Sequence, residues 1–240
     1  MQPVAGLHHI TAIAGPAQEN LDFYAGVLGC VSSKERQPGR SRHLPSFYAD
    51  AEGHPGTDLT FFPWSQLAPS RDGYGLSTEV SLAVPPDSLK FWNARLNRHD
   101  VQVFDLETRF GQRVLPLVDP HGLRISLTES ADSLERPFTP WERSPIPVEH
   151  QIRGLESARM VERDVGPTVS FLTDSLGFQK FGEENDWQRY GLGEGKSGQY
   201  VDLRSMPAGG SRRLGDGLGS SSRLANARRG APTRSARASR

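Results

Sequence analysis

The feature that most constrains the fold of this chain is an internal repeat. Residues 6–30 read GLHHITAIAGPAQENLDFYAGVLGC and align without a gap with residues 154–178, GLESARMVERDVGPTVSFLTDSLGF, a separation of 148 residues. Gly6 matches Gly154, and Phe23 matches Phe171. A period this long indicates duplication of a folding unit rather than a solenoid of short repeats.

Each copy of the repeat begins as a strand and continues as a helix. Residues 7–14 are strand-like, and residues 17–29 carry Leu21, Tyr24 and Leu28 at helical spacing before Gly29 ends the segment. Residues 77–84 alternate apolar and polar side chains, and residues 87–99 form an amphipathic helix with Asp87 as a plausible N-cap. Further strands are predicted at 57–64, 101–107, 113–119 and 123–129. The pattern predicts an α+β fold of repeated strand–helix–strand modules.

Composition limits the class of protein. Lys plus Arg and Asp plus Glu each number 28, so the formal net charge is zero and attraction to nucleic acid or anionic membrane is not expected. The single cysteine, Cys30, excludes an internal disulfide and fits a reducing compartment. No apolar run approaches the roughly 20 residues that span a bilayer, and the N-terminus lacks a secretory pattern. We therefore expect a soluble, cytoplasmic protein.

Two segments depart from the modular pattern. Residues 31–46 hold few apolar residues where a strand should follow the first helix. From Gly209 onward the tail contains eight arginines, no lysine and one acid, Asp216, so residues 206–240 are predicted to be disordered. A basic arm that binds nucleic acid is one interpretation. The favoured interpretation is coding DNA translated out of frame, because such sequence yields mainly Arg, Ala, Gly, Ser and Pro.

Three motifs in order carry a resemblance to a known family. They are GLHHITAIAG (6–15), NLDFYAGVLG (20–29) and DAEGHPGTDLTFFPW (50–64). The chain resembles the vicinal oxygen chelate superfamily of glyoxalases, bleomycin-resistance proteins and extradiol dioxygenases, and more closely its two-domain ring-cleaving dioxygenases. The similarity covers about residues 5–30 and 47–205. It implies βαβββ modules whose curved mixed sheets pair to enclose a divalent metal.

The resemblance implies a domain plan. Residues 1–130 form a first glyoxalase-like domain of two modules with 31–46 anomalous, residues 131–150 form a linker, and residues 151–205 form a partial second domain. In the family a fourth module follows and begins with another His-His strand, whereas this chain continues into the arginine-rich tail. We therefore expect an incomplete C-terminal part, and a chain truncated and frameshifted relative to the family.

The resemblance also implies the metal ligands. By its spacing to Phe23 and Tyr24, His9 falls at the ligand position of the first strand, and His8 points to the other side of it. Asp58 and Glu79 are alternative ligands, on the last strand of the first module and the first strand of the second. Ser126 stands where a Glu is expected. A His9–Asp58–Glu79 set would be unusual for the family, so the favoured arrangement has a second His and a Glu in the fourth module.

The function that the resemblance implies is ring cleavage of a catechol- or hydroquinone-like aromatic by O2. Two His and one carboxylate hold Fe(II) in such sites, with Mn(II) or Zn(II) as alternatives. An incomplete ligand set would leave this chain impaired or inactive. A glyoxalase-type lyase or isomerase and a non-catalytic drug-binding protein of the same fold remain open. A sheet edge left exposed would favour a homodimer.

Overall fold

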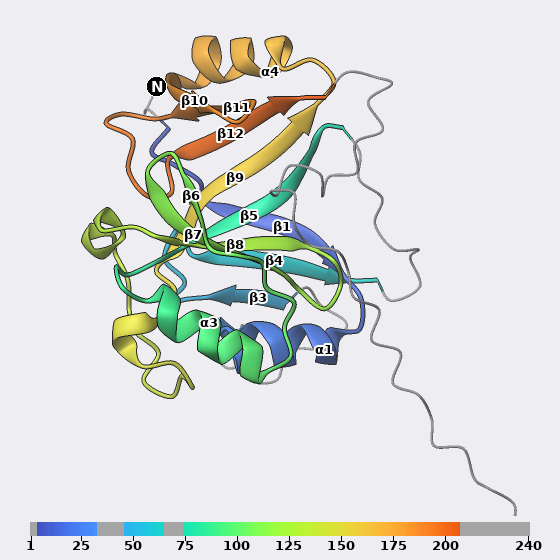
Figure 1. Cartoon of the computed structure of the whole chain (residues 1–240), viewed down its shortest axis with the longest axis vertical. Helices are drawn as coiled ribbons and strands as arrows, with labels where there is room; N and C mark the ends of the chain where they lie inside the picture. Colours follow the sequence, from blue (N-terminus) through green and yellow to red (C-terminus); the bar gives the residue numbers. More distant parts are fainter. Residues whose placement is uncertain (1–3, 33–45, 65–73, 207–240) are drawn as a thin grey trace, which may run out of the picture. The chain divides into compact units, whose positions relative to one another are not determined.

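A computed structural model of the chain describes residues 4–32, 46–64 and 74–206. Its elements confirm the α+β class. The helices α1 and α3 lie on one side of the strands, and α4 lies on the other (Figure 1). The first module comprises β1 (His9–Ala14), α1 (Ala17–Leu21) with a π-helical continuation (Asp22–Val27), β2 (Val31–Ser32), β3 (Ser46–Ala49) and β4 (Asp58–Pro63). The second comprises β5 (Leu76–Val84), α3 (Leu89–Arg98), β6 (Glu107–Arg109), β7 (Gln112–Val118) and β8 (Arg124–Glu129). The third comprises β9 (Gly154–Glu162), α4 (Gly166–Ser170) with a π-helical continuation (Phe171–Ser175), β10 (Gln179–Glu184), β11 (Trp187–Gly191) and β12 (Tyr200–Ser205).

All three modules share one strand topology. In each of them the first strand pairs in parallel with the last strand: β1 with β4, β5 with β8, and β9 with β12. Parallel strands need a crossover between them, and here the crossover carries the helix of the module. The predicted glyoxalase-like βαβββ repeat is therefore confirmed.

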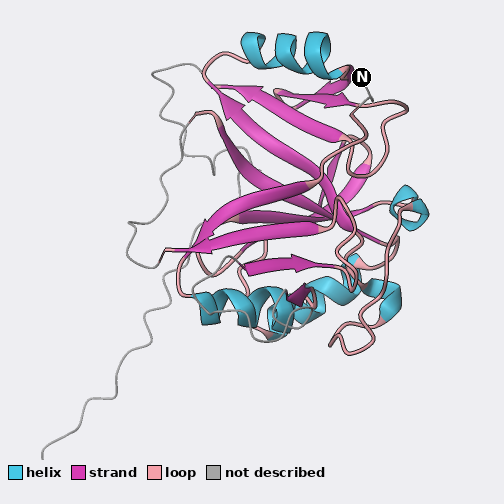
Figure 2. Ribbon diagram, turned by 180° about the vertical axis from the view of Figure 1, so that it is seen from behind, coloured by secondary structure: helices cyan, strands magenta, loops and turns pink. Residues whose placement is uncertain are grey.

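Within the described residues the strands form two sheets. One has the order β1-β4-β3-β2, and the other has the order β10-β11-β12-β9-β5-β8-β7-β6. The second sheet spans two modules because β5 and β9 pair antiparallel. Seen from the opposite side, the strands of both sheets lie between a layer that holds α1 and α3 and a layer that holds α4 (Figure 2).

The hydrophobic cores join different modules from those that the larger sheet joins. The larger cluster joins the first two modules, with Tyr24 and Phe61 from one packed among Leu82, Trp92 and Leu127 from the other. A smaller cluster belongs to the third module and contains Leu172, Phe178, Tyr190, Leu192, Val201 and Leu203. Arg95 of α3 also donates hydrogen bonds to the carbonyls of Gly26 and Val27 in the first module. The predicted boundaries at 130 and 151 remain predictions.

Several local expectations differ from the structure. The sequence indicated only the opening of a third module, whereas the structure has its helix and all four strands. Of the strand predicted at 101–107, residues 101–106 form a single bridge, Val103 to Leu117, and Glu107 begins β6. Asp87 does not cap α3, because its φ is 62° and Ser88 occupies the N-cap position. Of the anomalous segment 31–46, Val31–Ser32 forms β2 and Ser46 begins β3. Residues 33–45, and the predicted tail beyond Met206, lie outside the described residues.

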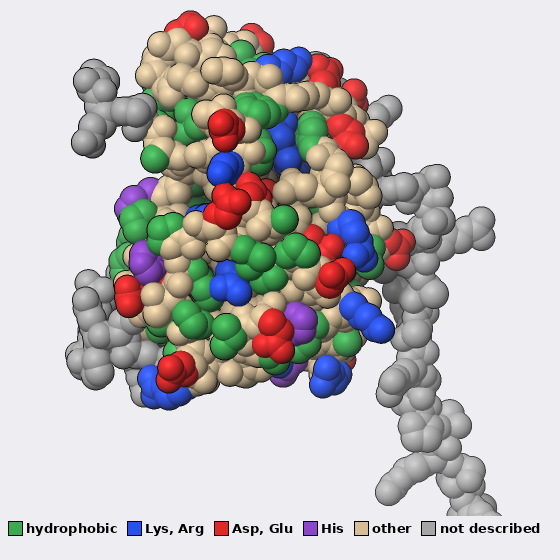
Figure 3. Space-filling model, turned by 90° about the vertical axis from the view of Figure 1, so that its left-hand side faces the viewer, with side chains coloured by type: hydrophobic (Ala, Val, Ile, Leu, Met, Phe, Trp, Pro, Cys, Tyr) green, Lys and Arg blue, Asp and Glu red, His purple; other side chains and the backbone are tan. Residues whose placement is uncertain are grey.

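The surface of the described part carries charges of both signs. Acidic and basic side chains are interspersed on the face shown in Figure 3, in line with the balanced composition. Among the described residues, the structure has no helix with the length and apolarity needed to cross a membrane.

Candidate functional site

Strand β1 presents two different faces. Side chains at His9, Thr11 and Ile13 are exposed, whereas those of the alternate positions are partly or fully buried. Ala14 belongs to the large core, and Ile10 packs against it. The period of two follows from strand geometry, which sends successive side chains to opposite faces. His9 therefore lies on the open face of the sheet.

Strand β4 brings Asp58 beside His9. The parallel register pairs His9 with Asp58, Thr11 with Thr60, and Ile13 with Phe62. Paired residues of neighbouring strands lie on the same face, about 4.8 Å apart along the sheet. The side chains of Leu59 and Phe61 point to the opposite face, into the core. Two of the three candidate ligands are thus neighbours.

The open face becomes apolar along the strands away from His9. Ile13 is 53% exposed and Phe62 is 37% exposed, although both are large hydrophobic residues. Trp64, just beyond β4, is 48% exposed, and its ring lies 5.9 Å from that of Phe62. The arrangement places a polar end, formed by His9 and Asp58, and an aromatic end on one surface.

The two adjacent histidines contact each other. Nδ1 of His8 and Nδ1 of His9 are 3.0 Å apart, which is hydrogen-bond distance when one ring carries the proton there. A hydrogen bond at one ring nitrogen directs the other towards a metal. In this arrangement the contact occupies Nδ1 of His9 and leaves its Nε2 for another partner.

Glu79 occupies a different environment. It is buried, contacts Nη1 of Arg109, and lies 4.0 Å from Nη1 of Arg159. Burial raises the pKa of the Glu79 carboxyl, but the two guanidinium groups outweigh that effect, so the net pKa is lowered. Binding a metal would require Glu79 to leave these cations.

Further ion pairs continue this cluster across the larger sheet. Nε of Arg189 lies 2.7 Å from the Asp202 carboxylate, and Nε of Arg159 lies 3.4 Å from it. Ser126 is fully buried and pairs with Ser81, two residues beyond Glu79. The larger sheet therefore holds Glu79, the candidate ligand that it contributes, within a network of buried ion pairs.

The described residues do not complete a metal site. Within residues 4–32, 46–64 and 74–206, no group of three or more His, Cys, Asp or Glu side chains is arranged to hold an ion. A two-His-one-carboxylate site needs three such ligands. His9 and Asp58 fit part of that set, and Glu79 is not grouped with them.

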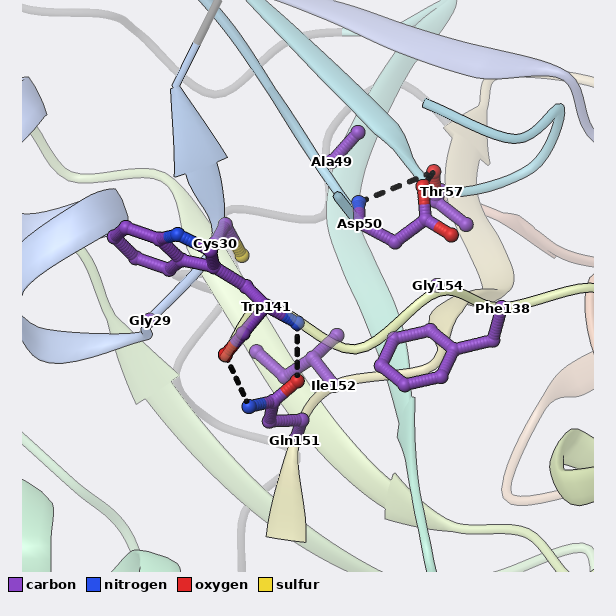
Figure 4. Close-up of a pocket in the computed structure, with 10 residues that line it drawn as sticks. All are labelled: Gly29, Cys30, Ala49, Asp50, Thr57, Phe138, Trp141, Gln151, Ile152 and Gly154. Atoms are coloured by element: carbon purple, nitrogen blue, oxygen red, sulfur yellow. Dashed lines mark hydrogen bonds between the residues drawn. The ribbon is translucent and has the colours of Figure 1, made fainter. Parts of the chain in front are cut away.

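A small cavity lies between the first module and the segment that precedes β9 (Figure 4). Its volume is about 20 Å³, enough for one water molecule and far below what an aromatic ring requires. The lining residues include Cys30, whose thiol has a pKa raised to about 12 by burial. Gln151 accepts a hydrogen bond from the amide of Trp141 and donates one to its carbonyl, which closes one wall. The cavity is a packing void rather than a substrate pocket.

The sequence indicates that His54 lies in a turn beside Gly53 and Pro55, but sequence reasoning missed the role of Asp50 in the turn that leads into β4. The Asp50 carboxylate accepts hydrogen bonds from the amides of Gly53, His54 and Thr139 and contacts the His54 ring at 2.6 Å. Asp at the start of a turn that continues into Gly is a recognisable signal for such a side-chain-closed turn. By fixing residues 50–57, this carboxylate helps to place Asp58.

The repeated βαβββ module defines the fold class of this protein. A solved structure of a candidate dioxygenase from Bacillus subtilis matches with a TM-score of 0.71 and 31% identity, over 87% of this chain and 66% of that one. No protein-family model matches the chain. The chain belongs to the vicinal oxygen chelate superfamily.

Curated relatives of the chain are named as dioxygenases. MhqO of Bacillus subtilis, named as a candidate ring-cleaving dioxygenase, is 35% identical over 85% of this chain and 64% of its own length. Chlorohydroquinone/hydroquinone 1,2-dioxygenase of Sphingobium indicum is 29% identical over 83% of this chain and 63% of its own length. The chain thus spans somewhat less than two thirds of the length of these curated relatives.

Proposed function

We propose that this protein is a ring-cleaving dioxygenase of the extradiol type that acts on a hydroquinone- or catechol-like aromatic. The observation that carries the proposal is the similarity, over more than four fifths of the chain, to a relative named as a hydroquinone 1,2-dioxygenase. In such a reaction one ring carbon–carbon bond breaks and both atoms of O2 enter the product, so no external reductant is needed. We place this reaction in the cytoplasm.

The open face of the smaller sheet is the surface that we assign to the substrate. His9 and Asp58 supply polar groups at one end, and Ile13, Phe62 and Trp64 supply exposed apolar surface at the other. An aromatic diol likewise has an apolar part, its ring, and a polar part, its hydroxyls. Apolar burial and ring stacking would favour binding on this face.

The metal of this proposal is Fe(II), with Mn(II) or Zn(II) as alternatives. His9 is the first ligand, Asp58 is the second candidate, and Glu79 is the weakest because two arginines already pair with it. We propose that the remaining ligands, a second His and a Glu, lie outside the described residues, in the part of the relatives that this chain does not match. We therefore expect the chain on its own to be impaired.

Oxygen consumption tests the proposed reaction. We expect the purified chain, loaded anaerobically with Fe(II) and then given hydroquinone or catechol in air, to consume O2 and diol in a ratio of about one to one. The rate should be below that of a full-length relative measured in parallel. His9→Ala should abolish the Fe(II)-dependent part, and His8→Ala should retain it.

Two results would contradict the proposal. One is an O2 uptake no higher than that of free Fe(II) or of the His9→Ala variant, since hydroquinones oxidise slowly in air without enzyme. The other is isomerisation of a hemithioacetal without ring cleavage, which would favour the glyoxalase-type alternative.

We further propose that the chain forms a homodimer through the edge of β1. Among the described residues β1 pairs with β4 alone, and unpaired strand edges recruit further strands. Sedimentation velocity would contradict this proposal if the chain remained monomeric at all concentrations tested.

A further inference from the structure

Arg136 contacts parts of the chain that are far apart in sequence. It follows the short 3₁₀ turn Asp132–Glu135, in the segment predicted as a linker. Its Nη1 donates to the carbonyl of Leu155 at 2.5 Å and to Oγ of Ser197 at 3.2 Å, and its Nη2 donates to the carbonyl of Gly56 at 2.9 Å. The planar guanidinium suits this task, because its donors point in several fixed directions at once.

Glycines surround the guanidinium of Arg136 where a side chain would collide with it. A Cβ placed on Gly56 would clash with Nη2 of Arg136, and a Cβ on Gly198 would lie 2.9 Å from Nη1. A Cβ on Gly154 would lie 2.5 Å from the carbonyl oxygen of Gly56 and 3.1 Å from Nη2. Gly56 also has a φ of +88°, which L-residues rarely adopt. Three glycines from two modules therefore leave the space that the guanidinium fills.

Gly56 links the site to the larger sheet. Its amide donates to the carbonyl of His8 at 2.6 Å, and its carbonyl accepts from the amide of Leu155 at 2.8 Å as well as from Arg136. His8 immediately precedes His9, and Gly56 stands two residues before Asp58. The chain segments at the starts of β1, β4 and β9 are thus linked by hydrogen bonds of Gly56, and Arg136 donates a hydrogen bond to the carbonyl of the same residue.

We infer that Arg136 is a positioning residue, which fixes the Gly56 turn so that His9 and Asp58 keep their place relative to β9. Arg136 touches neither of those side chains and acts through the backbone of Gly56 and His8. The role of the turn rests on geometry alone. The consequence for metal binding rests on the proposed function, in which His9 is a ligand.

Hydrogen exchange of single amides, followed by NMR in the full chain, tests the role of the turn. In Arg136→Ala, we expect the amides of Gly56 and Leu155 to lose protection by about tenfold or more relative to the core amides of Leu127 and Val201. Arg136→Lys should not restore protection, because one ammonium cannot reach acceptors on three segments in the same geometry. Arg153→Ala is the matched control, since Arg153 lies in the neighbouring segment and donates to Val148 instead.

A pair of glycine variants separates the effect of losing the contact with Arg136 from the backbone strain of a side chain at positive φ. Gly56 and Gly111 both have positive φ, but a Cβ on Gly111 would meet no atom within 4 Å. Gly56→Ala should reproduce the local loss of protection seen in Arg136→Ala, whereas Gly111→Ala should not. An equal loss of protection at all amides in Arg136→Ala, or restoration by lysine, would overturn the inference.

The consequence for metal binding has its own readout. Because loss of a residue that supports a ligand typically weakens metal affinity by roughly 10–100-fold, we expect a similar loss of Co(II) affinity in Arg136→Ala and little change in Arg153→Ala. Lost protection at Gly56 with unchanged Co(II) affinity would overturn the positioning of His9 by Arg136. Failure of the unaltered chain to bind Co(II) would instead count against the proposed function.

Discussion

Tyr24 stands where the helix of the first module meets the second. It is fully buried, and its hydroxyl donates to Oδ2 of Asp119 at 3.0 Å. Asp119 also accepts the amide hydrogens of His121 and Leu123, so the phenol is one of three donors to this carboxylate. Burial and the neighbouring carboxylate raise the pKa of Tyr24 well above its usual range. The hydroxyl therefore stays protonated and keeps donating.

Loss of that hydroxyl should destabilise the fold measurably. We expect Tyr24→Phe to lower the free energy of unfolding by about 1–2 kcal/mol, because a buried carboxylate loses a partner. Tyr190→Phe is the control, since its hydroxyl donates to the partly exposed Gln188 side chain. Urea unfolding followed by circular dichroism measures both. Equal losses in the two variants would contradict the role given to the Tyr24–Asp119 bond.

At the residue scale, the sequence predicts those features that depend on the local pattern of apolar and polar residues. The alternation around His9 and its motif place it on a strand, and the structure puts it on the open face. The surroundings of Glu79 could not be predicted, because Arg109 and Arg159 come from strands 30 and 80 residues away along the chain.

The strand register shows which positions of the first two modules correspond. In the first module His9 pairs with Asp58, and in the second module Ser81 pairs with Ser126. If Glu79 is the counterpart of His9, the counterpart of Ser126 is Thr60 rather than Asp58.

The turn formed by residues 50–57 shows how one buried group organises an element. Burial alone would raise the pKa of Asp50, but hydrogen bonds from Thr139, His54 and Gly53 outweigh it and lower the net pKa. The hydrogen bond to Asp50 raises the pKa of His54. The protonated imidazole and the ionised carboxylate thus stabilise each other across the turn.

This pairing predicts a pH-dependent effect. The contribution of His54 is fully present below its unfolded pKa of about 6.5 and is lost as pH rises through the higher folded pKa. The contribution of Asp50 is present above its unfolded pKa of about 3.9 and is lost as pH falls through the lower folded one. The stability deficit of His54→Ala should therefore be largest between about pH 4 and 6.5 and shrink at higher pH.

Chemical unfolding of His54→Ala and of the unaltered chain at pH 5, 7 and 9 measures this deficit. His99→Ala serves as a control, because His99 lies at the end of α3, away from Asp50. A deficit that stayed constant over this range would contradict the account of the turn.

Elements with strong amphipathic patterns were predicted well, and polar elements were not. The strand at 77–84 and the helix at 87–99 appear in the structure within two residues of their predicted ends. Strand β10 was missed because its residues, QKFGEE, are mostly exposed and carry little apolar periodicity. Tertiary pairing with β11, rather than local propensity, makes it a strand.

At the scale of the molecule, the repeat predicts duplicated modules but not how they join. The antiparallel pairing of β5 with β9 places modules two and three in one sheet, while the larger core joins modules one and two. Both arrangements depend on contacts between residues far apart in sequence, which no local pattern encodes. The proposal of an incomplete metal site belongs to this scale, because His9 and Asp58 come from one module and the proposal assigns the further ligands to another part of the family's fold.

A titration with Co(II), an air-stable probe that reports binding through its visible absorption, tests the central claim most directly. The full chain, His9→Ala and His8→Ala would be compared under identical conditions. We predict that the unaltered chain and His8→Ala bind with similar affinity and that His9→Ala binds at least about tenfold more weakly, since even loss of a supporting residue costs roughly 10–100-fold. Equal affinity in all three proteins, or a loss confined to His8→Ala, would contradict the assignment of His9 as the metal ligand.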